Sequence, residues 1–236
     1  MKRSGRFDLF LLILCSIFLV VIVGAVSPSG ALITPISNDT ATAADPGSIP
    51  AVAGNVTELN IEGVTTTQSW QGYFGNVSGT IQLADSSDNV MYNWSLASPQ
   101  GEIYASTSST LTWSSIACFD VANDGTALEN SFGIDWDDVD GVNETFSLND
   151  HSLFYTGNKE FGIGECNNTK IYGAGGVGAF DEVLLTDGAN TVFASLLQED
   201  GVGFDGATHD FEMLVLEDGH ETDVTVTPYY FWVELE

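Results

Sequence analysis

A continuously apolar stretch near the N-terminus constrains the fold of this chain more than any other feature of its sequence. It reads "LFLLILCSIFLVVIVGAV", Leu9–Val26, and its eighteen residues include no charge. As a helix these residues reach about 27 Å, which matches the ~30 Å hydrocarbon core of a bilayer. We therefore expect residues 9–26 to form a transmembrane helix. The alternative is a signal segment cleaved near the "VGA" of residues 23–25, because signals end in small residues.

The distribution of basic residues predicts the orientation of this segment. Three of the five basic residues of the chain precede the apolar run. Because positive flanks stay in the cytoplasm, residues 1–8 are predicted to be a cytoplasmic basic end and the chain beyond Val26 to be extracellular. The protein would then be a single-pass protein of the cell membrane, or a secreted protein if the segment is cleaved. The three basic residues are Lys2, Arg3 and Arg6.

Acidic residues outnumber basic ones by 33 to 5, which gives a formal net charge of −28. Beyond the apolar run only Lys159 and Lys170 are basic. Uncompensated negative charges repel one another and disfavour a compact state unless cations screen or bridge them. Nucleic acid and anionic lipid are therefore poor partners, whereas cations, other envelope proteins and glycans are the partners that we expect.

Cysteines and glycosylation motifs agree with export. Cys118 and Cys166 lie beyond the apolar run, and an oxidising compartment would join them in a disulfide. Two unpaired buried thiols are the alternative, and Cys15 is expected to pack within the membrane. Asn-X-Ser/Thr motifs also follow the run, although such triplets arise by chance in chains rich in Thr and Asn. The candidate acceptors are Asn38, Asn55, Asn76, Asn93, Asn143 and Asn167.

The rest of the chain divides by composition into two parts. Residues 27–54 are rich in Ala, Ser, Thr, Pro and Gly without apolar periodicity, which predicts a flexible extracytoplasmic stalk. Residues 55–236 contain many short β-rich segments separated by Gly, Asp, Asn and Ser turns, and few helix signals. "VSGTIQLA" and "VMYNWSLA" alternate apolar and polar residues around the turn cluster "DSSDN", so they predict a hairpin. The predicted fold is all-β, an antiparallel sandwich or jelly-roll-like ectodomain.

The acidic stretch "GIDWDDVDG", Gly133–Gly141, is a candidate cation site. Its spacing does not fit an EF-hand loop, because Val139 stands at the fifth position and the glycine comes one place late. An irregular calcium site, a catalytic carboxylate pair and a solvated acidic turn remain as interpretations. The candidate calcium ligands are Asp135, Asp137, Asp138 and Asp140.

Two further motifs resemble functional sites without their context. "GAGGVG", Gly173–Gly178, matches the dinucleotide pattern G-x-G-x-x-G, but the strand-like "AFDEVLL" follows it and a glycine-rich sheet loop is expected instead. The histidines have no helical ligand spacing, so hydrogen-bonded or surface positions are expected. A zinc site would have to combine His151, His209 and His220, or the last two with Glu212 or Glu221.

Five tryptophans could contribute to the core or stack on sugars. Trp70 and Trp136 stand beside glycine-rich turns, and these two are the candidates for a glycan platform. Tryptophans on alternating strands are more often buried, so a core position is the alternative.

The segments "SWQGYFGNVSGTIQLAD", "MYNWSLASPQGEIYAS", "GATHDFEMLVLEDG" and "TPYYFWVEL" resemble uncharacterised surface-exposed proteins of archaea. That resemblance implies an N-terminal membrane segment and a β-rich outer domain. It implies no activity, so it transfers no functional residues to this chain.

Together these features predict a non-enzymatic structural or interaction module of the cell surface, membrane-anchored, strongly acidic and dependent on cations. A carbohydrate-binding module is the first alternative. A secreted hydrolase would need two converging carboxylates or a metal cluster. A pilin-like filament subunit would need a glutamate where Phe10 stands, five residues after Gly5.

Overall fold

The computed structural model describes residues 27–235, except 97, 99, 174 and 219–224. The predicted basic end, residues 1–8, and the predicted transmembrane segment, residues 9–26, lie outside the described residues. Within the described part, no helix has the length and apolarity needed to cross a membrane.

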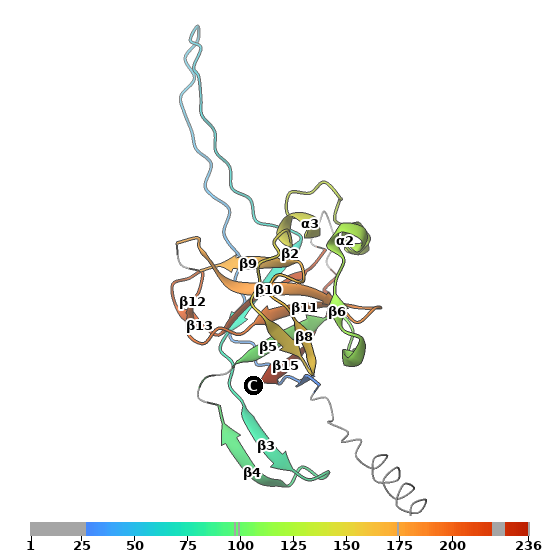
Figure 1. Ribbon diagram of the computed structural model, residues 1–236. Helices are drawn as coiled ribbons and strands as arrows, with labels where there is room; N and C mark the ends of the chain where they lie inside the picture. The colour runs from blue at the N-terminus through green and yellow to red at the C-terminus, as the bar shows by residue number, and fades with distance from the viewer. Residues whose placement is uncertain (1–26, 97, 99, 174, 219–224, 236) are drawn as a thin grey trace, which may run out of the picture.

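The central element is a seven-stranded sheet in which every pair of neighbours is antiparallel (Figure 1). Its order is β1-β15-β5-β11-β10-β6, and β9 also pairs with β10. Both β9 and β6 lie on the side of β10 that faces away from β11, one after the other along its length. The strands are β1 (Ser29–Gly30), β5 (Gly101–Ser106), β6 (Ala117–Cys118), β9 (Asn168–Tyr172), β10 (Gly178–Thr186), β11 (Thr191–Leu196) and β15 (Tyr230–Leu235).

Four antiparallel ribbons surround this sheet, so the predicted all-β class is confirmed. One of them, β2 with β14, stacks on the central sheet through contacts of β14 with β10 and β11. The ribbons are β2 (Trp70–Gly75) with β14 (Phe211–Leu216), β3 (Thr80–Ala84) with β4 (Val90–Ser95), β7 (Phe154–Thr156) with β8 (Lys159–Phe161), and β12 (Gly201–Val202) with β13 (Thr208–His209).

Three short helical segments complete the domain: η1 (Trp113–Ser115), α2 (Val121–Ser131) and α3 (Val142–Thr145). Helix α2 begins after Asp120, whose side chain accepts a hydrogen bond from the Asn123 N–H at 3.1 Å. Such an N-cap satisfies one of the donors that a helix start leaves open. A side chain at Gly125, inside α2, would crowd the Asn143 side chain, so the close approach of α3 favours glycine there.

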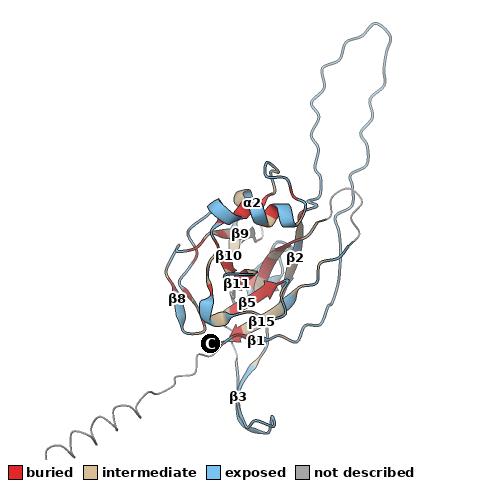
Figure 2. Cartoon of the chain, turned by 90° about the vertical axis from the view of Figure 1, so that its right-hand side faces the viewer, coloured by how far each residue is buried: buried red, intermediate tan, exposed pale blue. Residues whose placement is uncertain are grey.

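Alternation along the strands gives the central sheet two buried faces (Figure 2). One face packs against β2, β14 and α2 and includes Ile103, Leu184 and Phe193. The opposite face packs against β7, β8 and the segment around η1, and includes Tyr104 and Val183. Because both faces are covered, the middle strands of this sheet are apolar on both sides.

The N-terminal part of the described chain differs from a simple stalk. Strand β1 forms the edge of the central sheet by pairing with β15, and the Ala31 N–H donates to the Phe231 carbonyl oxygen at 3.0 Å. The predicted stalk, residues 27–54, therefore starts inside the central sheet. Residues 32–68 then run as an exposed extended segment without a described strand, and this segment projects from the end of the domain opposite β1 (Figure 1).

The predicted hairpin is present as β3 and β4, joined by a turn at residues 85–89. The Asp85 carboxylate caps this turn by accepting hydrogen bonds from the Ser87 and Asn89 N–H groups at 2.8 and 3.0 Å. These donors and the Asn89 side-chain amide lower the pKa of Asp85. Every residue of both strands is exposed, because the hairpin projects away from the rest of the domain.

Candidate functional site

The acidic stretch at residues 133–141 connects α2 to α3 as a chain of turns. The Asp135 N–H donates to the Asp138 carboxylate at 3.2 Å, and the Trp70 indole N–H donates to the Asp140 carbonyl oxygen at 2.5 Å. The Asp140 carboxylate accepts a hydrogen bond from the Thr67 hydroxyl. Asp137 is exposed. Among the described residues no three His, Cys, Asp or Glu side chains gather in a way that could hold a metal ion, so the four predicted calcium ligands do not form such a group.

Cys118 and Cys166 form the predicted disulfide, with an S–S distance of 1.91 Å and a Cα–Cα distance of 5.0 Å. Cys118 ends β6, and Cys166 lies two residues before β9. Both segments line the same side of β10, so the disulfide ties together two edge segments that are 48 residues apart in the chain.

The two described histidines stabilise loops. His151 is fully buried: its Nδ1 lies 2.7 Å from the Ser152 carbonyl oxygen, and its Nε2 accepts from the Cys166 N–H at 3.0 Å. His209 Nε2 lies 3.0 Å from the Asp205 carboxylate, and its ring packs on Phe74. The predicted partners His220 and Glu221 lie outside the described residues.

The "GAGGVG" segment forms the turn between β9 and β10. The Gly173 N–H donates to the Val177 carbonyl oxygen at 2.7 Å, and Gly175 and Gly176 have φ values of 82° and 74°. Only glycine adopts two such left-handed conformations in succession without strain. A strand follows the turn, so the expectation of a glycine-rich sheet loop is confirmed.

The tryptophan candidates separate by exposure. Trp70 packs against Phe146 and Phe193 with ring centroids 6.0 and 6.4 Å apart, so it belongs to the core and its ring faces are not free to stack on a sugar. Trp136 is 70% exposed. Trp94, which the sequence did not single out, is 51% exposed on β4 and contacts Tyr92.

The candidate glycosylation acceptors also differ in exposure. Asn143 and Asn167 are half-buried, and the Asn167 side chain donates to the Phe146 carbonyl oxygen at 3.1 Å. The remaining acceptors are exposed: Asn38, Asn55, Asn76 and Asn93.

Buried acidic side chains hold backbone N–H groups of neighbouring loops and strands, a use that the sequence pattern does not reveal. Asp187 accepts from the N–H groups of Thr112, Ala189 and Asn190 at 2.8–3.0 Å. Burial alone raises a carboxyl pKa, but these donors outweigh burial and lower the pKa of Asp187 to about 2. Asp210 likewise accepts from the Val77 N–H at 2.7 Å.

Three buried glutamates have one carboxylate oxygen bonded to a backbone N–H and a second, buried oxygen without a hydrogen-bond partner. Glu129 accepts from the Val142 N–H at 2.7 Å, Glu182 from the Leu214 N–H at 2.8 Å, and Glu212 from the Phe204 N–H at 2.9 Å. Burial raises the pKa of Glu182 well above its usual value and also raises that of Glu212. Charged carboxylates are disfavoured in such surroundings, so Glu182 and Glu212 hold protons at higher pH than exposed glutamates do.

One pair of carboxylates converges at a tyrosine hydroxyl. Glu102 and Glu234 stand opposite each other on β5 and β15, and the Tyr104 hydroxyl lies 3.4 and 3.3 Å from them. The Gly157 N–H donates to both oxygens of Glu234 at 2.9 Å. The two glutamates are only 4% and 7% exposed, and the cluster lies between β5, β15 and β7.

Glu102 also borders a hollow of about 420 Å³ at the surface, together with Tyr155, Asp181 and Glu199. Asp181 is already paired with Lys170 at 2.8 Å, and Glu199 accepts from the Ser98 hydroxyl at 2.8 Å. The acids at this hollow are therefore engaged separately and do not form a pair of free catalytic groups.

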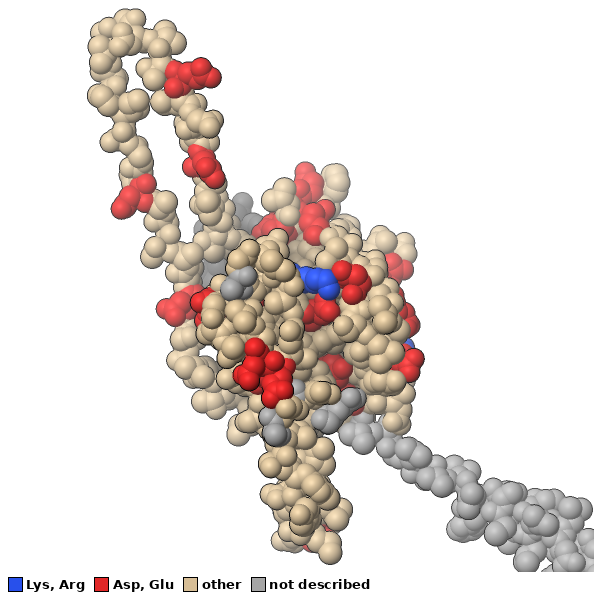
Figure 3. All heavy atoms as spheres, turned by 60° about the vertical axis from the view of Figure 1, so that its left-hand side comes forward, with Lys and Arg blue, Asp and Glu red and all other residues tan. Residues whose placement is uncertain are grey.

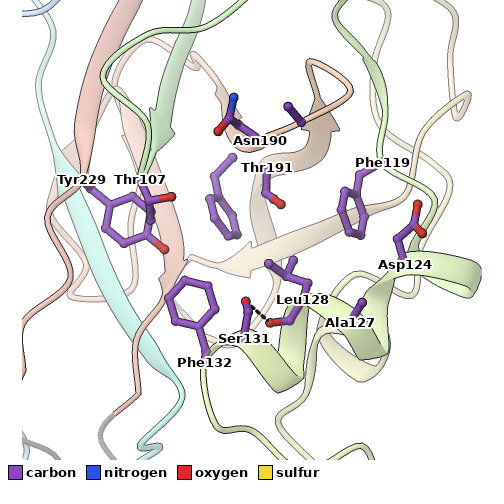
Figure 4. Close-up of a pocket in the computed structure, with 12 residues that line it drawn as sticks. Thr107, Phe119, Asp124, Ala127, Leu128, Ser131, Phe132, Asn190, Thr191 and Tyr229 are labelled. Atoms are coloured by element: carbon purple, nitrogen blue, oxygen red, sulfur yellow. Dashed lines mark hydrogen bonds between the residues drawn. The ribbon is translucent and has the colours of Figure 1, made fainter.

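A second hollow, of about 340 Å³, lies between α2 and the turn that joins β10 to β11 (Figure 4). Its walls combine apolar and polar side chains, and the Ser131 hydroxyl donates to the Leu128 carbonyl oxygen at 2.7 Å. Asp124 is the only acidic side chain that lines it. This arrangement could accept a small apolar group, but it lacks the paired acid and base that bond cleavage needs. Its aromatic walls are Phe119, Phe132, Phe193 and Tyr229.

Comparisons of the chain with protein-family models, with curated proteins and with solved structures found no match.

Proposed function

We propose that this protein is a non-enzymatic structural or interaction module of the cell surface, anchored in the membrane through residues 9–26. The β-rich domain would face outward. Within the all-β class, we expect its fold to be a jelly-roll-like sandwich. Envelope proteins, cations or glycans are the proposed partners, and nucleic acid is not among them.

The observation that carries this proposal is the use of the buried acids. Asp187, Asp210 and Glu182 each accept hydrogen bonds from backbone N–H groups, which stabilises loops and strands. A glycoside hydrolase would instead place two carboxylates across an open cleft. Supporting the outward location, the Cys118–Cys166 disulfide is of the kind that persists in oxidising compartments.

Dependence on cations follows from the net charge of −28. On the face that Figure 3 shows, acidic side chains form scattered patches with few basic ones between them. Screening by salt weakens repulsion between such charges. The midpoint of thermal unfolding should therefore rise with sodium chloride, and rise further at equal ionic strength with calcium if divalent ions bridge the acids. An unchanged midpoint in both series would exclude cation dependence.

A carbohydrate-binding module is the second candidate, favoured by two exposed tryptophans. Trp136 and Trp94 are 70% and 51% exposed, and aromatic faces of this kind stack on sugar rings. They lie on separate elements, the α2–α3 connection and β4, so each would act alone. Glycan-array binding that is lost in Trp136→Ala would favour this candidate over the first.

Proteolysis of intact cells tests the proposed topology. The extended segment contains no Lys or Arg but does contain Glu58 and Glu62, both exposed, so a glutamate-specific protease should cut there. We expect cleavage in intact cells that express the full chain, and no cleavage at these sites in the matched control Glu58→Gln/Glu62→Gln. Cutting that requires permeabilised cells would place the domain inside and overturn the proposal.

A further inference from the structure

The β3–β4 hairpin is amphipathic, with a polar and an apolar face. On one face the cross-strand pairs are Ile81 with Trp94 and Leu83 with Tyr92. On the other face the pairs are Thr80 with Ser95 and Gln82 with Asn93. The apolar face thus gathers two aliphatic and two aromatic side chains, and the opposite face carries a candidate glycosylation acceptor, Asn93.

The apolar face is uncovered. Its four side chains are exposed by 44% (Ile81), 52% (Leu83), 60% (Tyr92) and 51% (Trp94). An isolated two-stranded hairpin is marginally stable in water, and it gains stability when a hydrophobic face is covered. A large exposed apolar patch on a soluble domain marks a surface for a partner or a membrane.

The two strands of the hairpin carry no charge, although the chain as a whole is strongly acidic. Figure 3 shows the hairpin as an uncharged projection with acidic side chains only at its tip. These are Asp85 and Asp88 of the turn. The strands can therefore approach an apolar or zwitterionic surface without bringing carboxylates with them, while the tip stays in water.

The base of the hairpin lies where the chain enters the domain. Ser29, two residues after the start of the described chain, pairs with Val233, two residues before Leu235. A Cβ at Gly79, which directly precedes β3, would overlap the Leu235 side chain, so the hairpin starts at the same place. The described chain therefore begins near the end of β15 at which the hairpin starts.

We propose that the hairpin is a membrane-docking arm, whose apolar face lies in the interfacial layer of the bilayer that residues 9–26 would span. This inference rests on the anchor in the proposed function and adds a second contact with the same membrane. Tyr and Trp favour the membrane–water interface, where an apolar ring and a polar N–H or O–H are both accommodated.

Geometry favours lipid over a second copy of the chain. Six residues of strand reach about 20 Å, and the base of the hairpin lies near the start of the described chain, so an anchor formed by residues 9–26 would keep the arm close to the bilayer surface. Such tethering gives the second contact a high effective concentration. A partner copy would have to enter this narrow space with its own acidic surface. The polar face with Asn93 would point to water.

Quenching by brominated lipids tests the arm in the full chain. The chain is reconstituted into zwitterionic phosphatidylcholine vesicles that carry bromine at shallow or deep acyl positions, and tryptophan fluorescence is recorded. We expect shallow bromines to quench the wild type and Trp94→Phe to lose most of that quenching. Trp136→Phe is the matched control, since Trp136 is exposed on the α2–α3 connection at the other end of the domain, and it should keep the quenching.

Flotation of the vesicles separates failure of the anchor from failure of the arm. If the chain floats with vesicles after alkaline extraction but Trp94→Phe is quenched like the wild type, the proposed docking of the hairpin is wrong and the proposed membrane anchor is supported. If the chain does not float, both are wrong. Protection of Trp94 from both lipid bromine and aqueous acrylamide, lost when the chain is diluted in the vesicles, would assign the face to a second copy and overturn the arm. Ile81→Ser should weaken quenching of Trp94 in parallel, because it removes the apolar partner directly across the strand.

Discussion

Replacing Glu182 by glutamine removes a buried titrating group from the middle of the domain. Glu182 on β10 is 0% exposed, one oxygen accepts the Leu214 N–H at 2.8 Å, and the other has no hydrogen-bond partner. Burial raises the pKa of this carboxyl well above its usual value, and the single donor offsets burial only in part. The folded protein therefore keeps a proton on Glu182 at pH values where the unfolded chain has lost it.

The size of the effect follows from this difference in bound protons. Between the unfolded pKa, about 4.3, and the raised folded pKa, the folded state holds one more proton than the unfolded chain. The free energy of unfolding then falls by about 1.4 kcal/mol for each pH unit in that window. The contribution of Glu182 is fully present below the unfolded pKa and is lost as the pH rises through the folded pKa. Glu182→Gln cannot ionise, so it lacks this slope.

Chemical unfolding of the full chain in detergent at pH 5, 6 and 7, followed by tryptophan fluorescence, measures the slope. All other groups titrate in both proteins, so subtracting the wild-type free energy of unfolding from that of the variant isolates Glu182. We expect the free energy of unfolding of Glu182→Gln, relative to that of the wild type, to increase by about 1.4 kcal/mol per pH unit until the pH exceeds the folded pKa of Glu182. Glu58→Gln, on the exposed extended segment, is the control and should show no trend. Parallel curves for wild type and Glu182→Gln would refute the reasoning.

Three further variants test the stabilising contacts. Cys118→Ala/Cys166→Ala opens a loop of 48 residues and should lower the free energy of unfolding by about 4 kcal/mol, whereas a loss below about 1 kcal/mol in denaturant titrations would contradict the chain-entropy argument. Asp187→Asn should cost about 1–3 kcal/mol at pH 7. Because the pKa of Asp187 is lowered to about 2, its contribution is present above pH ~4 and lost towards pH 2, so variant and wild type should converge in acid. Tyr229→Phe removes a hydrogen bond of 2.8 Å to the Leu216 carbonyl oxygen and should lower the thermal midpoint by the equivalent of about 0.5–1.5 kcal/mol, and an unchanged midpoint would mean that water replaces the bond.

Local sequence patterns were sufficient to predict elements whose structure depends on residues that are neighbours in the chain. The period-2 alternation around "DSSDN" predicted the β3–β4 hairpin, because both strands and their turn are contiguous in the chain. Helix α2 was not predicted as a distinct element, since Gly125 lowers helix propensity and the reason for that glycine, the approach of α3, lies elsewhere in the chain.

Features that depend on residues far apart in the chain could not be predicted from local sequence patterns. The pairing of β1 with β15 joins residues about two hundred positions apart, and two residues of Ser and Gly give no strand signal. Trp70 became a core residue because Phe146 and Phe193 surround it. Glu182 looks like any other acid in an acidic chain, and only its inward position on β10 raises its pKa.

The edge position of β1 determines how the domain would respond to mechanical load applied at Ser27. Two paired residues separate that point from the extended segment, so tension would unzip β1 from β15 first, one hydrogen bond at a time. Unzipping would free the chain up to β2, whose six pairs with β14 make the next resistance. The released segment has about forty residues and would extend to a length on the order of 130 Å. The central sheet would lose only its outermost strand.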